Sequence, residues 1–138
     1  MSALAEIDER QLTDAFEAGS VPDGEFTHAD HVRVAWELLR RYPLGLALDQ
    51  VTRGIRTLAQ QRGLPGLYHA TITTIYVLAV ADRRARAGGA DDFATFAAMH
   101  PDLLGPSRAF LGGYYSAETL DGECARREFV LPERLGAG

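Results

Sequence analysis

The feature that most constrains this chain is the spacing of its apolar residues between breaks at glycine and proline. Within the segment 27–42, apolar residues recur three or four positions apart, at Val32, Ala35, Trp36 and Leu39. Residues with this spacing share one face of an α-helix, whereas a half-buried strand would need strict alternation. The pattern therefore predicts an all-α protein.

The same reasoning predicts seven helices along the chain. Their expected bounds are residues 9–18, 27–42, 46–62, 67–86, 91–99, 106–115 and 118–127. The segment 67–86 contains many β-branched residues, which favour strands. Its apolar stretch is too long for a typical strand, so we expect a buried helix that ends at Gly88-Gly89.

Polar residues mark the starts of two of these helices. Asp8 and Gln11, and Thr27 and Asp30, have the three-residue spacing of a capping box, in which two side chains bond to orphan backbone N–H groups. Gly63 is a typical residue with which to end a helix, because it tolerates the left-handed conformation.

The chain length of 138 residues fits one domain that can bury a core of its own. We expect a compact single-domain helical bundle over residues 1–138. Four longer helices would be followed by shorter C-terminal helices, and the tail 133–138 would fray. Cys124 is the only cysteine, which excludes an intrachain disulfide and a cysteine-based structural zinc site.

The charge of the chain excludes several classes of function. A net charge of -5 argues against a nucleic-acid partner, which normally requires a basic surface. The sequence contains no lysine, and this excludes Schiff-base chemistry. No apolar run approaches about 20 residues and no signal peptide is recognisable, so we expect a bacterial cytoplasmic protein without membrane contact.

Three of the four histidines stand at predicted helix starts. His28 and His31 are three positions apart in the first turn of the segment 27–42, so their side chains share a face. His69 follows the break at Pro65-Gly66, in the first turn of the helix predicted over residues 67–86. The helix dipole disfavours imidazolium at such positions and keeps the rings neutral, as a metal ligand or a general base requires.

If the two helix starts converge, His28, His31 and His69 would hold a divalent metal ion and leave a position open for water or substrate. Imidazole suits zinc, copper, iron and nickel, so the residues do not select among these metals. The alternative is that each histidine hydrogen-bonds to backbone or carboxylate groups in a polar pocket.

Other polar residues accompany these histidines. Thr73 and Tyr76 lie on the same helical face as His69, where they could orient a substrate or a bound water molecule. Asp30 is a candidate metal ligand, although its position favours the capping role. Glu37 is expected to point away from His31 into solvent.

Aromatic and basic residues are expected to have mainly structural roles. Trp36 and the pair Tyr114-Tyr115 could wall a small-molecule pocket, but packing in the core is the simpler expectation. Arg83, Arg84 and Arg86 form a charge run of the kind that usually makes solvated faces or ion pairs.

Three segments of the chain resemble a recurrent bacterial family of small helical proteins. They are FTHADHVRVAWELL, GLYHATITTIYVLAVADR, and YYSAETL followed by CARREFVLP, within roughly residues 24–132. The shared patterns are Phe-x-His-x-x-His-Val, Tyr-His-x-Thr-Ile-Thr and Ala-Arg-x-x-Phe-Val-x-Pro. The resemblance implies that the three segments form one unit, and it implies no particular activity. The family often has a glutamate where this chain has Ala70, which disfavours any function that needs a carboxylate there.

Three functions remain open on the sequence. The first is a metal-dependent enzyme that acts on a small organic molecule through the three histidines, with Tyr76 and Thr73 orienting the substrate. The second is a metal-free His/Tyr pocket that binds a small molecule or performs acid/base chemistry. The third is a non-catalytic interaction module, for which a homodimer through an apolar helix face is the simplest form.

Overall fold

A computed structural model describes residues 3–87, 90 and 92–134 of the chain. Over these residues the protein is helical and contains no strand, so the predicted all-α fold is confirmed. The α-helices are α1 Glu9–Ala18, α2 His28–Arg41, α3 Leu44–Arg62, α4 Ala70–Ala87, α5 Phe93–Met99, α6 Ser107–Leu111, α7 Ala117–Asp121 and α8 Glu123–Arg127. Short 3-10 helices are Ala3–Glu6, Pro65–Leu67 and Pro101–Leu103.

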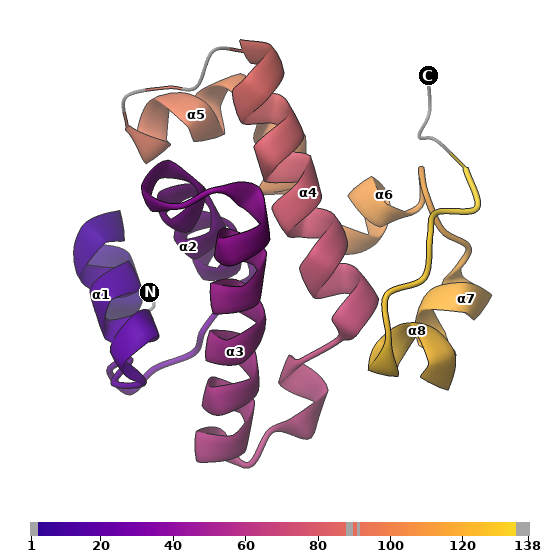
Figure 1. The fold of residues 1–138 in the computed structure, drawn as a ribbon, viewed down its shortest axis with the longest axis horizontal. Helices are drawn as coiled ribbons and strands as arrows, with labels where there is room; N and C mark the ends of the chain where they lie inside the picture. Colours follow the sequence, from indigo (N-terminus) through magenta and orange to yellow (C-terminus); the bar gives the residue numbers. More distant parts are fainter. Residues whose placement is uncertain (1–2, 88–89, 91, 135–138) are drawn as a thin grey trace.

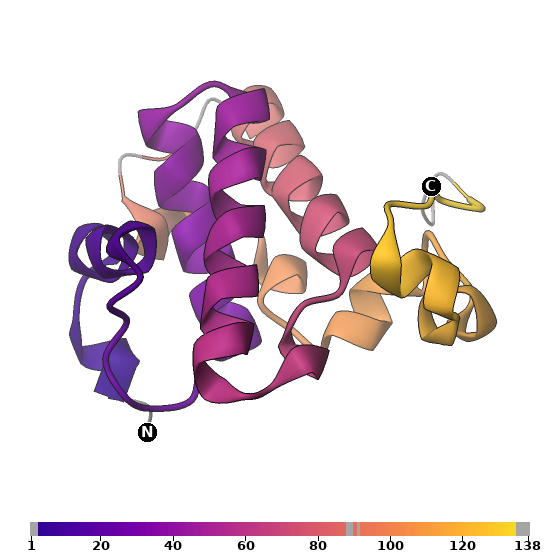
Figure 2. The same cartoon turned by 60° about the horizontal axis from the view of Figure 1, so that its bottom comes forward.

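Helix α2 lies at the centre of the bundle. It contacts α1, α3, α4 and α5 (Figure 1). Helices α3 and α4 lie side by side (Figure 2), and α4 also contacts α8. Helix α4 therefore connects the N-terminal three helices to the shorter C-terminal ones. Within the described residues, no helix combines the length and the apolar character needed to cross a bilayer.

The apolar residues form two clusters, and α2 contributes to both. The first cluster joins α1, α2 and α3 and includes Phe16, Val34, Leu38, Val51 and Ile55. The second joins α2 and α4 to the C-terminal half and includes Val32, Trp36, Tyr76, Phe96, Leu103 and Leu120. Because neighbours cover α2 on two sides, every residue from 32 to 38 is buried. This burial is wider than the single stripe that the sequence predicts.

The predicted helix caps are confirmed. Asp8 and Gln11 form a capping box at the start of α1, with the Asp8 carboxylate 2.8 Å from the Gln11 backbone nitrogen. Thr27 and Asp30 form the second box at the start of α2. Gly63 ends α3 with φ 61°, in the left-handed region. Residues within one turn of each other determine these features, which is why the sequence reveals them.

Several helix boundaries differ from the prediction. Helix α4 begins at Ala70, because Pro65–Leu67 forms a separate 3-10 turn before it. The single helix expected over residues 118–127 is two helices, because the extended backbone of Gly122 (ψ 153°) separates α7 from α8. The expected stop at Gly88-Gly89, the expected start at residue 91 and residues 135–138 of the tail lie outside the described residues.

The expectation that Glu37 faces solvent is wrong. Its side chain is buried, and its carboxylate accepts hydrogen bonds from Arg40 and Arg41 at 2.8 to 2.9 Å. Burial opposes ionisation of Glu37, but the bonds from the two arginines outweigh it and hold its pKa below the ordinary value. The helix face that carries Glu37 is covered because α2 has neighbours on more than one side.

Candidate functional site

The first turn of α2 and the middle of α4 bring two histidines against a tyrosine. The ring centroids of His28 and Tyr76 are 4.4 Å apart, those of His31 and Tyr76 6.2 Å, and those of the two histidines 6.5 Å. The capping box at Thr27 begins α2 directly before His28, so both histidines project from its first turns. We call these three residues the histidine–tyrosine cluster.

Two polar atoms of the cluster are buried without a hydrogen-bond partner. These atoms are His31 Nε2 and the Tyr76 hydroxyl oxygen. His28 differs, because its Nε2 lies 2.8 Å from the Leu103 carbonyl oxygen and must donate to it. Buried polar groups are normally paired, so two unpaired ones in the same cluster make it the candidate binding site.

The surroundings fix the charge state of the cluster. Burial, and after it the nearby His28, lowers the pKa of His31 to about 4. Burial also lowers the pKa of His28, and the bond to Leu103 only partly opposes this. Burial and then the charge of Asp102 raise the pKa of Tyr76. At neutral pH the cluster therefore consists of uncharged imidazoles and a protonated phenol.

His69 has a different role from the other two histidines. Its Nε2 lies 2.8 Å from the Leu120 carbonyl oxygen, and its Nδ1 accepts a hydrogen bond from the Ile72 backbone at 3.2 Å. Both ring nitrogens are thus used: Nε2 joins the start of α4 to α7, and Nδ1 caps the first turn of α4. This is the polar role that the sequence left open as the alternative to metal binding.

The predicted three-histidine metal site requires a rearrangement of this geometry. Among the residues that the structure describes, no group of three or more His, Cys, Asp or Glu side chains is placed to hold a metal ion. A metal shared with His28 and His31 would require His69 to give up at least one of its hydrogen bonds. The metal site therefore stays a prediction that the observed contacts do not support.

The other two candidates, Thr73 and Asp30, both have buried side chains. Thr73 is buried on α4, between the turns that carry His69 and Tyr76. Asp30 takes the predicted capping role: its carboxylate accepts from the Thr27 backbone at 2.9 Å and also binds Arg33 at 2.9 Å. Asp30 is consequently not free to act as a ligand.

A surface pocket lies next to the cluster. It has a volume of about 520 Å³, and we call it the Phe110 pocket. Its lining comprises Arg83, Asp102, Gly105, Pro106, Ala109, Phe110, Gly112, Gly113 and Tyr114. The Phe110 ring also packs on Tyr76, with centroids 5.2 Å apart, so it belongs to the pocket and contacts the cluster as well. Arg83 and Asp102 form an ion pair at 2.6 Å at the pocket.

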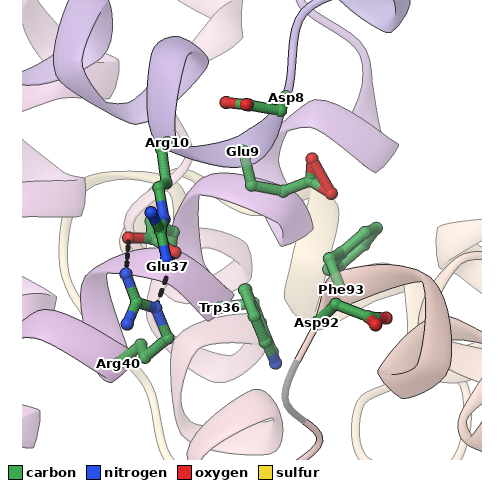
Figure 3. A pocket seen from close by; sticks show the side chains of 8 residues that line it. All are labelled: Asp8, Glu9, Arg10, Trp36, Glu37, Arg40, Asp92 and Phe93. Atoms are coloured by element: carbon green, nitrogen blue, oxygen red, sulfur yellow. Dashed lines mark hydrogen bonds and ion pairs between the residues drawn. The ribbon is translucent and has the colours of Figure 1, made fainter.

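Sequence reasoning missed this pocket. Arg83 belongs to the run that was expected to form ion pairs, and it does so, but nothing in the sequence indicates Asp102 as its partner. Tyr114 and Tyr115 are adjacent in the sequence but have different surroundings. Tyr114 lines the Phe110 pocket, whereas the buried Tyr115 donates to the Val130 carbonyl at 2.6 Å. Trp36 lines a different pocket, together with Phe93 of α5 (Figure 3).

No family model, curated protein or solved structure significantly matches this chain. The resemblance to a bacterial family of small helical proteins stays a prediction. The site is therefore interpreted from its own chemistry.

Proposed function

We propose that this protein binds a small, uncharged organic molecule at the histidine–tyrosine cluster, without a metal ion. The observation that carries the proposal is the pair of buried and unpartnered groups, His31 Nε2 and the Tyr76 hydroxyl. A ligand with one hydrogen-bonding group would satisfy one or both of them. Leaving such a group unpaired costs about 1 to 3 kcal/mol, so a ligand that pairs it gains a matching amount.

The Phe110 pocket supplies the space for the body of the ligand. Its volume of about 520 Å³ is within the range of small-molecule sites, roughly 300 to 1,000 Å³. The aromatic rings of Phe110 and Tyr114 offer an apolar surface. The Tyr76 side chain is fully buried and the Phe110 ring packs on it, so a ligand reaches the hydroxyl only after a movement of the side chains that cover it.

The pKa values favour binding over general-base catalysis. A general base is most effective when its pKa is near the working pH, and the pKa of His31 is about 4. His31 is thus a weak base at neutral pH, and Tyr76 holds its proton firmly because its pKa is raised. Uncharged groups of this kind serve as hydrogen-bond partners for an uncharged ligand. A cytoplasmic location without a nucleic-acid partner is part of the same proposal.

The proposal is tested with phenol as the probe, because phenol has an apolar ring and a hydroxyl that both donates and accepts. Phenol is titrated into protein without a histidine tag, and the imidazole signals of the four histidines are followed by NMR. We expect a saturable shift at His31 that is lost in Tyr76→Phe. The matched control is Tyr115→Phe, which removes a buried hydroxyl outside the cluster and should leave the shift unchanged.

A parallel titration with zinc chloride separates this function from the metal hypothesis. Unshifted His31 signals in phenol would overturn the proposal. Stoichiometric zinc binding that perturbs His28, His31 and His69 together would overturn it in favour of the three-histidine metal site. Zinc that produces no joint perturbation, combined with the phenol response, supports the metal-free site.

A further inference from the structure

The Phe110 pocket contains a cation, Arg83, that a hydroxyl contact at Tyr76 leaves unused. Arg83 and Tyr76 are seven residues apart on α4, so they lie on the same face of the helix, about 10.5 Å apart along its axis. Phe110 lines the pocket together with Arg83 and also packs on the Tyr76 ring. The pocket therefore has a guanidinium in its lining and the Tyr76 ring directly behind one of its walls.

Arg83 has more hydrogen-bond donors than it has acceptors around it. Its Nη1 and Nη2 donate to the two carboxylate oxygens of Asp102, at 3.0 and 2.6 Å. Nη1 also lies 3.1 Å from Nδ1 of His100, and because a guanidinium only donates, Nδ1 accepts this bond. Among the residues that the structure describes, the N–H of Nε and the second N–H of Nη2 have no acceptor.

The two donors without acceptors form one edge of the guanidinium. Nε–H and the outer N–H of Nη2 point in parallel, in the fork arrangement with which arginine binds oxygen acceptors. Asp102 and His100 hold the group from its other sides, and the His100 ring packs on Phe96 with centroids 4.8 Å apart. The Arg83 side chain is 26% exposed. The fork is thus held in a fixed direction and is accessible to a ligand in the pocket that Arg83 lines.

The charge of Arg83 is already compensated. The hydrogen bonds with Asp102 raise the pKa of Arg83, and the same bonds hold the pKa of Asp102 below its ordinary value, so both groups are ionised at neutral pH. Asp82 also acts on Arg83 through its charge, although it is bound to Arg86 at 2.8 Å. A carboxylate ligand at the fork would face these anions across a single cation. An uncharged acceptor avoids that repulsion.

We propose that Arg83 and Asp102 select a ligand that carries a primary carboxamide. The carbonyl oxygen of the ligand accepts from the Arg83 fork, and its amide N–H donates to the Asp102 carboxylate, which is 51% exposed. The aromatic ring of the ligand packs on Phe110 and Tyr114. This inference rests on the proposed function, because the hydroxyl at the other end of the same ligand binds Tyr76. The ligand class is then a hydroxyaryl carboxamide.

The probe is 4-hydroxyphenylacetamide, titrated into the full-length protein without a histidine tag. Its comparisons are phenol, which lacks the amide, and 4-hydroxyphenylacetate, which replaces the amide by a carboxylate. By calorimetry at pH 7, we expect the amide to bind at least about tenfold more tightly than either of them, because a hydrogen bond to a charged group adds this much. By NMR, the Nε–H signal of Arg83 should shift with the amide. It should not shift with 4-isobutylphenol, which has the same shape without the polar atoms.

Two variants test the two charges of the pair. Arg83→Gln removes the fork and should weaken amide binding about tenfold while leaving phenol binding unchanged. Its matched control is Arg86→Gln on the same helix, which removes an exposed arginine bound to Asp82 and should change neither affinity. Asp102→Asn keeps the fork and removes the compensating charge. We expect it to reverse the preference, so that 4-hydroxyphenylacetate binds more tightly than the amide.

The carboxamide site would be overturned by any of three results. They are equal affinities for the amide and phenol, tighter binding of the carboxylate than of the amide to the wild type, and unchanged amide affinity in Arg83→Gln. If Arg83→Gln does not fold, as judged by circular dichroism, the ligand comparison on the wild type and the reversal in Asp102→Asn decide the question.

Failure of the proposed function is distinguishable from failure of this inference. A phenol response at His31 that is lost in Tyr76→Phe, combined with no gain from the amide, overturns the carboxamide site alone. If phenol gives no response while phenylacetamide, which lacks the hydroxyl, shifts the Arg83 Nε–H signal, the carboxamide site is supported and the hydroxyl contact at Tyr76 is overturned.

Discussion

Replacing Tyr76 by phenylalanine should stabilise this protein, although the tyrosine is fully buried. The Tyr76 hydroxyl has no partner, whereas the hydroxyl of the equally buried Tyr115 donates to the Val130 carbonyl at 2.6 Å. The two substitutions remove the same atom from two buried rings. They differ only in whether that atom was hydrogen-bonded, so the pair isolates the contribution of the bond.

The magnitude follows from the cost of desolvating a hydroxyl. An unpaired buried donor costs about 1 to 3 kcal/mol, which Tyr76→Phe recovers, less the small loss of contacts made by the oxygen atom. We therefore expect its free energy of unfolding to rise by about 1 kcal/mol. Tyr115→Phe loses a hydrogen bond worth about 1 kcal/mol, so the free energy of unfolding of this variant should fall by a similar amount. For a chain of this length, each change moves the melting temperature by roughly 4 °C, in opposite directions.

Urea unfolding at pH 7, followed by Trp36 fluorescence and by far-UV circular dichroism, measures both values. Coincident transitions with the two probes establish two-state behaviour and permit the comparison. If Tyr76→Phe is destabilised as much as Tyr115→Phe, then the Tyr76 hydroxyl has a bound partner in solution. The reasoning that makes it a free ligand-binding group would then be refuted.

Three further predictions concern stability. The pKa of His31, lowered to about 4 from 6.5, means that the unfolded chain binds a proton that the folded chain does not. The free energy of unfolding should thus fall by roughly 3 kcal/mol as the pH falls from 6.5 to 4, and urea titrations across that range should show a much flatter profile in His31→Gln. Glu37→Gln leaves two arginines facing a buried amide and should lower the free energy of unfolding by about 2 kcal/mol; an unchanged urea midpoint would contradict the buried ion pairs. In Gly54→Ala the new Cβ would lie 2.1 Å from the Phe16 ring, so we expect a loss of about 2 kcal/mol, whereas Gly45→Ala on the same helix meets nothing within 4 Å and should gain up to about 1 kcal/mol. Thermal melts that rank these two alanine variants the other way would refute the close contact.

Local signals in the sequence determined the helical class and several element ends. The capping box at Thr27 and the terminal Gly63 each depend on residues within one turn, so the sequence is sufficient to place them. The β-branched stretch of α4 was the hardest case, and its length identified it correctly as a helix. The split at Gly122 was not foreseen, because the propensities of the flanking residues permit one continuous helix.

The sequence also selected His28, His31 and Tyr76 as candidate site residues, because helical spacing places each of them on a definite face. Which faces meet was decided only by the tertiary structure. The packing of α4 against α2 brings Tyr76 to the two histidines and turns His69 toward the Leu120 carbonyl. The rotation of one helix about its axis relative to another depends on the fit of many side chains from distant parts of the chain, and no local pattern encodes it.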